Sequence, residues 1–387
     1  MKQAAMIHRA EGHRRDDVRR LWELSFHEGG PHYVDWFFRD VYTPENTLCL
    51  TQEGELLSVL QMIPYPVSLR GRRVTMDTLT GVATAPEHKL RGHARRLMAE
   101  SLRDMARRGQ GFTFLYPFDH VFYTRLGWVT VSEQLEYLRP LAELPEALPT
   151  GYEAVFSQEP GIRVLSAIYD SFMAGRNLRV LREERLWRKR LGELRSLGGQ
   201  CVLLYHDGQP CAYGLIEEGE DEIRLSEQIS PRPQDTLALL AALRPLGKTV
   251  YWSAPTDDRA RLLDGHWIDR VHLQPFVMLR VTDAVLAVAQ TAAAADGKLV
   301  IEIHGDTMAE GNNGLWRLTA QGGQGTLARA EGQPEFTCTV GALCRILCGN
   351  CTATEAAAAG LAQGSAGALG LLDTMYPKLR NYIFEMY

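Results

Sequence analysis

The segment most diagnostic of the architecture runs Val82-Ala83-Thr84-Ala85-Pro86-Glu87-His88-Lys89-Leu90-Arg91-Gly92-His93-Ala94-Arg95-Arg96. Residues 75–84, before the proline, have the pattern of a β-strand. Beyond it, apolar residues recur at helical spacing, at Leu90, Ala94, Leu97, Met98, Leu102 and Met105. The segment therefore predicts a strand, a short loop and a helix with Gly92 in its first turn. One face of this helix is apolar and the other is basic.

The junction between this strand and this helix is a candidate anion site. Backbone N–H groups at a helix N-terminus lack partners and carry partial positive charge. A glycine there lets a pyrophosphate approach closely, and Arg91, Arg95 and Arg96 would add charge-assisted contacts to phosphates. The alternative interpretation is a solvated surface helix with a basic face.

The flanking segments complete an α+β unit. Residues 16–38 have the pattern of two helices broken by a Gly-Gly-Pro turn, and residues 48–50 and 57–63 have the pattern of strands. After the basic helix, residues 112–116 form a short apolar strand. This order predicts a mixed sheet with one parallel crossover.

The chain has 387 residues, which is too many for one ordinary domain. Residues 140–151 contain three prolines and are typical of a linker. Mixed helix and strand patterns follow to about residue 282, where the composition becomes Ala-rich. We therefore expect three domains, at 1–146, 147–283 and 284–387.

The composition excludes several classes of protein. A net charge of -5 gives no support to nucleic-acid binding. The seven cysteines have no disulfide-framework spacing, which indicates reduced thiols in a cytoplasmic protein. A secretory signal and an apolar run of 18 residues are both absent from the sequence, so we expect no membrane contact.

Two further motifs have simpler explanations. The spacing Cys344-x3-Cys348-x2-Cys351 is that of an iron–sulfur site, but Cys344 and Cys348 take apolar positions on an expected helix, where cysteine acts as a small hydrophobe. Gly323-x-Gly325-x2-Ala328 imitates a dinucleotide-binding motif, but a hairpin turn fits the flanking pattern better.

A second chemical constellation is Phe118-Asp119-His120-Val121-Phe122-Tyr123-Thr124-Arg125-Leu126-Gly127-Trp128. A tyrosine hydroxyl, with a pKa near ~10, is able to protonate a thiolate leaving group held within hydrogen-bond distance. Tyr123 is the candidate for this role. The alternative is a packed aromatic side chain whose hydroxyl is satisfied elsewhere.

These two motifs resemble those of the GNAT N-acetyltransferases. Lys89, Gly92 and Ala94 occupy the places of the coenzyme A-binding motif, and Phe-Tyr-x-Arg-x-Gly-aromatic is typical of the family's following helix. The three-part layout and the ending Tyr382-Ile383-Phe384-Glu385-Met386-Tyr387 resemble the enhanced intracellular survival (Eis) family in particular. That resemblance implies tandem GNAT domains followed by a sterol-carrier-protein-like domain.

The resemblance also implies a function and a set of site residues. It implies acetyl transfer from acetyl-CoA, without a metal, to a primary amine of an aminoglycoside-like or polyamine substrate. A protein lysine acetyltransferase, or a regulator that binds lipid or acyl-CoA, is the alternative. Acetyl-CoA would contact Val82, Ala83, Thr84, Leu90, Arg91, Gly92, His93, Ala94, Arg95, Phe118 and Asp119.

For catalysis, the resemblance implies that the C-terminal carboxylate of Tyr387 acts as the base, whereas the alternative is a tail that only packs. The acceptor pocket would be large and acidic, with Phe26, His27, Trp36, Phe37, Asp77 and Glu385 as candidates. Phe26, Trp36 and Phe37 fit a core position equally well. Members of the Eis family are hexamers, so the resemblance implies a homo-oligomer.

Overall fold

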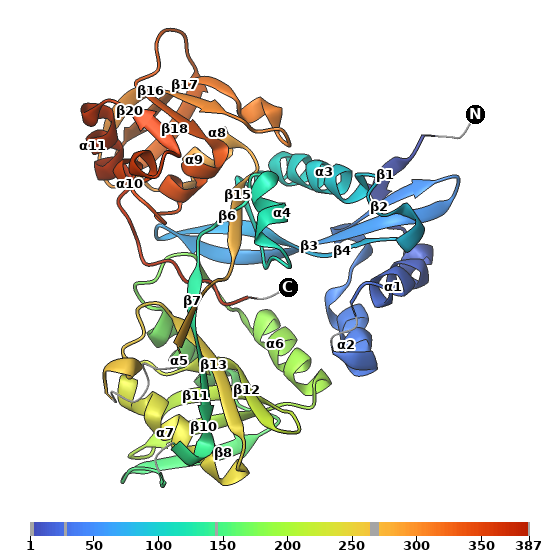
Figure 1. The fold of residues 1–387 in the computed structure, drawn as a ribbon, viewed down its shortest axis with the longest axis vertical. Helices are drawn as coiled ribbons and strands as arrows, with labels where there is room; N and C mark the ends of the chain where they lie inside the picture. Colours follow the sequence, from blue (N-terminus) through green and yellow to red (C-terminus); the bar gives the residue numbers. More distant parts are fainter. Residues whose placement is uncertain (1–3, 27–28, 144–145, 264–270, 386–387) are drawn as a thin grey trace.

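The protein is described here by a computed structural model, covering residues 4–26, 29–143, 146–263 and 271–385. Three sheets, each with its own helices, follow one another through the molecule (Figure 1). The first sheet lies between the other two, with the third sheet above it and the second sheet below it in that view. This arrangement confirms the predicted α+β class.

The first sheet contains the expected site. Its order is β1 (Met6–Arg9), β2 (Thr47–Gln52), β3 (Glu55–Leu69), β4 (Arg72–Thr84), β5 (Phe112–Leu115), β15 (Met278–Val281) and β6 (Val129–Thr130). Only the β4–β5 pair is parallel among the described pairs of this sheet, and the crossover between them is α3 (His93–Arg107). The strand and helix predicted on either side of Pro86 are thus confirmed.

Helix α3 covers one face of this sheet through the apolar stripe read from the sequence. Leu97, Met98, Leu102 and Met105 are fully buried against residues of β2, β3 and β4. Helices α1 (Arg15–Glu23) and α2 (Gly30–Trp36) form a separate aromatic cluster beside the end of β4. The end of β4 is therefore supported by a rigid core on two sides.

The second sheet has the order β14 (Val271–Pro275), β7 (Glu133–Pro140), β13 (Thr249–Pro255), β12 (Glu222–Ile229), β11 (Gln209–Glu218), β10 (Gln200–His206) and β8 (Tyr152–Ser157). Helices α5 (Ile162–Met173) and α6 (Glu184–Ser196) pack on one face of it, and α7 (Pro233–Leu243) packs on the other. Alternation along β10 explains this, since Cys201 and Leu203 face α5 and α6 while Val202 and Leu204 face α7.

Two strands cross between the sheets. β7 lies within the first 146 residues but pairs with β13 and β14 in the second sheet. Conversely, β15 comes from beyond residue 277 and lies between β5 and β6 of the first sheet. The short strand β9 (Arg179–Val180) also pairs with β3. The division at 146/147 and 283/284 stays a prediction, and the sheets do not follow it strand by strand.

The third sheet has the order β18 (Gln324–Arg329), β17 (Gly314–Gln321), β16 (Gly297–His304), β19 (Phe336–Thr339) and β20 (Ala362–Gly364). Its helices are α8 (Ala284–Gln290), α9 (Val340–Leu347), α10 (Ala353–Ala358) and α11 (Ala366–Met375). Gly322 and Gly323 form the turn between β17 and β18, which confirms the hairpin. Cys344 and Cys348 are buried in the apolar core as thiols, as expected for structural cysteines.

The C-terminal segment, residues 380–385, returns from the third sheet and lies between the other two (Figure 1). Asn381 is held by Asn177, whose amide donates to its side-chain oxygen at 2.8 Å. Tyr382 and Phe384 enter the core of α5 and α6, and Ile383 enters the core that contains Tyr65 of β3. Within the described part of the chain, no helix has the length and hydropathy needed to cross a membrane.

Candidate active site

Strand β4 separates early from its parallel neighbour. Its pairing with β5 is limited to Asp77↔Thr113 and Thr78↔Phe114, whereas its pairing with β3 continues to Thr84. Within the described strands, residues 79–84 of β4 therefore have no partner on the β5 side, and we call this stretch the unpaired edge of β4. Such an edge presents backbone N–H and C=O groups that are able to bind an extended ligand.

A β-bulge lies within the unpaired edge. Gly81 and Val82 together lie opposite one residue of β3, because the register shifts between Val59↔Ala83 and Gln61↔Thr80. Gly81 has φ +56°, and a Cβ there would come within 1.7 Å of the Gln61 side-chain oxygen. Only glycine fits both constraints. The sequence analysis missed Gly81, although an isolated glycine in a strand is a signal for a bulge.

The start of α3 follows this edge after a connection, residues 85–92, that contains a short 3-10 helix at Pro86–His88. The N-cap of α3 is Gly92, with φ +77°, and no side chain caps the helix. Leu90 before it also has a positive φ of +62° and an exposed side chain. The N–H groups of the first turn thus have no capping partner among the described residues, which leaves them available to an anion.

The candidate cofactor residues around this turn differ in what they offer. Leu90, Arg91, Gly92 and Arg95 are exposed, His93 and Ala94 are half-buried, and Val82 and Thr84 are half-buried on β4. The side chain of Ala83 is buried in the α1–α2 core, so only its backbone could meet a ligand. Arg95 donates to the Thr307 hydroxyl at 3.1 Å, which ties this turn to the C-terminal domain.

Tyr123 lies in α4 (His120–Arg125), just after β5. The Asp119 carboxylate caps this helix by accepting from the N–H of Val121 at 2.8 Å and of Phe122 at 3.2 Å. Tyr123 is 5% exposed, and among the described residues its hydroxyl has no hydrogen-bond partner. Burial raises the pKa of Tyr123 to about 12, so the phenol is protonated at neutral pH. The neighbouring Phe118 ring is 79% exposed.

The end of the tail is held by a buried ion network that the sequence did not reveal. Arg182, about 1% exposed, donates from Nε to Glu385 at 2.7 Å and from its two terminal nitrogens to Glu227 at 2.6 and 3.0 Å. Burial alone would raise the pKa of Glu227, but Arg182 and Arg190 lower it below its usual value. Glu385 is therefore an anchoring residue, and Tyr387 lies outside the described residues.

The remaining acceptor candidates lie in different environments. Trp36 lines a groove between α2 and α6, and Phe26 is 37% exposed after α1. Phe37 is 1% exposed, and the centre of its ring lies 5.0 Å from that of Trp22, so it packs in the aromatic core, the alternative that the sequence left open for it. His27 lies outside the described residues.

Asp77, a further acceptor candidate, lies in the interior of the first domain. Its side chain is completely buried, and its two oxygens accept from Arg108 at 2.6 Å and from Gln110 at 2.8 Å. Both partners follow α3 in the sequence, so Asp77 holds the end of that helix against β4. It does not face an acceptor.

Comparison with known proteins agrees with this geometry. Residues 6–131 match the family model described as acetyltransferase (GNAT) domain, which contains the unpaired edge of β4, the turn into α3 and Tyr123. Residues 6–131 are a GNAT acetyltransferase domain. Residues 279–384 match the sterol carrier protein domain, so the GNAT domain is joined to a second recognisable domain at the other end of the chain.

Solved structures share the fold of the whole chain. A conserved Enterococcus faecalis protein of unknown function has a TM-score of 0.85 at 17% identity, covering 100% of both chains. Eis1 from Mycobacterium abscessus has a TM-score of 0.74 at 19% identity, covering 99% of this chain and 100% of its own. These likenesses establish the fold, and they confirm the Eis-like layout at that level.

A curated relative, an uncharacterized N-acetyltransferase from Streptomyces griseus, is 23% identical over 265 residues. The match covers 61% of this chain and 64% of the relative's length, so the chain spans less than two thirds of that protein.

Proposed function

We propose that this protein is an N-acetyltransferase that transfers the acetyl group of acetyl-CoA to a primary amine. One observation carries the proposal: a single short connection, residues 85–92, joins the unpaired edge of β4 to the uncapped N-terminus of α3, within a GNAT domain. An extended thioester arm and a pyrophosphate need these two kinds of backbone group next to each other.

The chain fits acetyl-CoA on its own chemistry. The N–H groups of residues 92–95 would bind the pyrophosphate, with Arg91 and Arg95 adding charge. The unpaired edge, residues 79–84, would hold the pantetheine arm through its backbone. The exposed Phe118 ring lies next to Tyr123, where an apolar surface would exclude water from the thioester. Bound there, acetyl-CoA supplies an activated carbonyl.

Tyr123 would act at the leaving group. The amine nitrogen forms the new bond to the carbonyl carbon, the carbon–sulfur bond breaks, and the sulfur receives a hydrogen bond from the Tyr123 hydroxyl. Since the pKa of this phenol, about 12, lies above the ~8.5 of a thiol, complete proton transfer is uphill. Tyr123 therefore stabilises the developing negative charge, and the amide, the thiol and one proton are released in total.

The incoming amine must first lose a proton, because its pKa is near ~10. We assign this step to the C-terminal carboxylate of Tyr387, which follows the anchored Glu385 by two residues. Burial of a carboxylate raises its pKa and makes it a better base. On this assignment, Arg182 is a positioning residue, since it acts through the tail and does not touch the substrate.

Release of coenzyme A thiol tests the proposal. The full-length protein is mixed with acetyl-CoA and, separately, an aminoglycoside, a polyamine, a lysine peptide and amino acids, which include the substrate classes implied by the Eis resemblance. We expect release that depends on the amine, with the acetylated amine found by mass spectrometry. Tight acetyl-CoA binding without release for any amine would refute the enzyme and favour an acyl-CoA-binding regulator.

Removal of Tyr387 then separates the proposed role of the tail as a base from acetyl-CoA binding. We expect loss of turnover with acetyl-CoA affinity unchanged, because the tail does not form the cofactor site. A Tyr387→Phe variant keeps the carboxylate and is the matched control, so it should retain activity. Full activity after the deletion would refute the role of the tail as base.

A further inference from the structure

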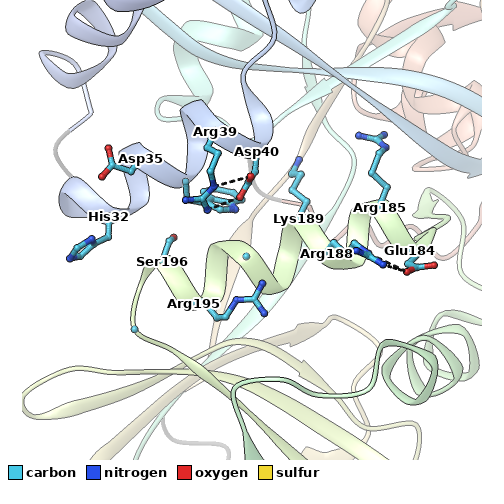
Figure 2. A pocket seen from close by; sticks show the side chains of 13 residues that line it. His32, Asp35, Arg39, Asp40, Glu184, Arg185, Arg188, Lys189, Arg195 and Ser196 are labelled. Carbon is cyan, nitrogen blue, oxygen red and sulfur yellow. Dashed lines mark hydrogen bonds and ion pairs between the residues drawn. The ribbon is translucent and has the colours of Figure 1, made fainter.

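A groove of about 1350 Å³ lies between α2 of the first domain and α6 of the second (Figure 2). One wall contains His32, Asp35, Trp36, Arg39 and Asp40, and the other contains residues 184–198 of α6 and the turn after it. Its volume exceeds that of an ordinary small-molecule site. The groove was not predicted, because its two walls come from segments more than 140 residues apart.

The charges on this groove are mostly positive. Its described lining contains three carboxylates, Asp35, Asp40 and Glu184, and five cationic side chains. Each carboxylate has an arginine partner: Arg19 at 2.7 Å, Arg39 at 2.8 Å and Arg188 at 2.5 Å, respectively. These pairs are exposed and contribute little stability, but they neutralise the carboxylates. Within the described lining, the groove thus offers no uncommitted carboxylate to an ammonium group.

Arg185 is different from the other arginines of α6. Among the described residues it has no hydrogen-bond or ion-pair partner, whereas Arg188 turns toward Glu184 (Figure 2). Arg185 and Lys189 are one helical turn apart and extend from α6 toward the same side. An unpaired guanidinium beside an ammonium group is a favourable site for a carboxylate or a phosphate.

This end of the groove is also next to the tail. Lys189 donates to the Tyr65 hydroxyl on β3, and its ammonium lies 4.6 Å from the centre of that ring. The centres of the Tyr65 and Phe114 rings are 5.7 Å apart, and Phe114 belongs to β5, the strand that separates from β4. Burial lowers the pKa of Lys189 to about 7, and the charge of Glu385 opposes this shift. A bound anion would favour its ammonium form further.

We infer that the acceptor is an amine that also bears an anionic group, a carboxylate or a phosphate, and that Arg185 binds this group. The inference rests on the proposed function, since it takes the groove as the route by which the acceptor reaches the tail. A polycationic amine would meet Arg185 and Lys189 unfavourably, because its ammonium groups carry the same charge as these two side chains. The groove thus selects against the most cationic substrates.

Matched pairs of acceptors test this inference. Lysine and cadaverine differ only by a carboxylate, and glucosamine 6-phosphate and glucosamine differ only by a phosphate. We expect kcat/KM to be about tenfold higher for the anionic member of at least one pair, the factor that corresponds to ~1.4 kcal/mol. The pair that shows the preference identifies the anion. Equal or better use of cadaverine and glucosamine would overturn the inference.

Two variants assign the preference to Arg185. Arg185→Ala should remove it by raising KM for the anionic acceptor, and Arg185→Glu should reverse it. Arg224→Ala is the matched control, because Arg224 is an exposed arginine of the second domain that is outside the groove and stacks over Tyr251. An unchanged preference in Arg185→Ala would contradict the assignment.

A binding measurement separates this inference from the proposed function. Calorimetry with the acetylated products of both pairs requires no turnover: Nε-acetyllysine against N-acetylcadaverine, and N-acetylglucosamine 6-phosphate against N-acetylglucosamine. We expect about tenfold tighter binding of the anionic product in at least one pair, lost in Arg185→Ala. Equal binding within both pairs would overturn the anion site even if the enzyme were active. A preference in binding without any turnover would leave the anion site in place and refute the catalytic proposal.

Discussion

Replacement of Glu385 tests how the second domain controls the tail. In Glu385→Ala, the bond from Arg182 at 2.7 Å is lost, while the two bonds from Arg182 to Glu227 remain. Arg182 therefore keeps a partner, and the cost is that of one charge-assisted hydrogen bond, about 2 kcal/mol. Residues 381–384 stay docked through their own contacts, so the change should loosen only the last residues of the chain.

A loss of ~2 kcal/mol in docking corresponds to about a thirtyfold change in the docking equilibrium. We expect kcat to fall by up to that factor in Glu385→Ala and by a few-fold in Glu385→Gln, which keeps a neutral acceptor. Steady-state kinetics measure kcat, calorimetry measures acetyl-CoA affinity, and a thermal melt measures stability.

Asp235→Ala is the matched control for this variant. Asp235 is a buried carboxylate of α7 that accepts from Arg232 at 2.7 Å, and α7 packs on the face of the second sheet opposite to α5 and α6. This variant should lower the melting temperature similarly and leave kcat nearly unchanged. Full kcat in Glu385→Ala, or an equal loss of kcat in Asp235→Ala, would refute the positioning role.

Three further results are expected. Tyr123→Phe should lower kcat about a hundredfold or more with an unchanged melting temperature, because the hydroxyl has no partner among the described residues; a large loss of stability in calorimetry would contradict this. Burial raises the pKa of Tyr123 to about 12, so its protonated form persists to higher pH than in an exposed tyrosine. The pH profile of kcat/KM should therefore show no descending limb from Tyr123 below about pH 11. A descending limb near pH 9 that vanishes in Tyr123→Phe would contradict this prediction. Asp77→Asn should lower the free energy of unfolding by about 2–3 kcal/mol, since Arg108 is partly exposed and loses one charged partner. The same variant should leave the preference among acceptors unchanged. A changed preference would indicate that Asp77 contributes to acceptor binding.

The parts of the fold that were predictable are those set by local sequence. The apolar spacing from Leu97 to Met105 is enough to fix the buried face of α3, and the turn at Gly92 follows from its neighbours in the chain. The crossing of β7 and β15 between the sheets has no local signal in the sequence. Each strand has an ordinary alternating or apolar pattern, which does not indicate the strand it pairs with. The partner of each strand is decided only when the sheets assemble.

The same reasoning explains the errors at the site. Arg182 and Glu385 are separated by 203 residues, and each is an unremarked charge in its own segment. Asp77 was a pocket candidate because the Eis resemblance implies an acidic acceptor pocket, but its partners Arg108 and Gln110 become visible only when α3 is folded back. Phe37 was ambiguous because an aromatic residue near a site suits a core and a pocket equally.

The position of β15 has a consequence for biosynthesis. The first sheet needs residues 278–281 between β5 and β6, yet β6 ends at residue 130. At about 5–20 residues per second, the ribosome adds the intervening residues in roughly 7 to 30 s. During that time the first sheet has an open apolar seam beside Phe112 and Phe114, both fully buried in the finished protein. Nascent chains of this protein should therefore depend on chaperones until most of the chain has emerged.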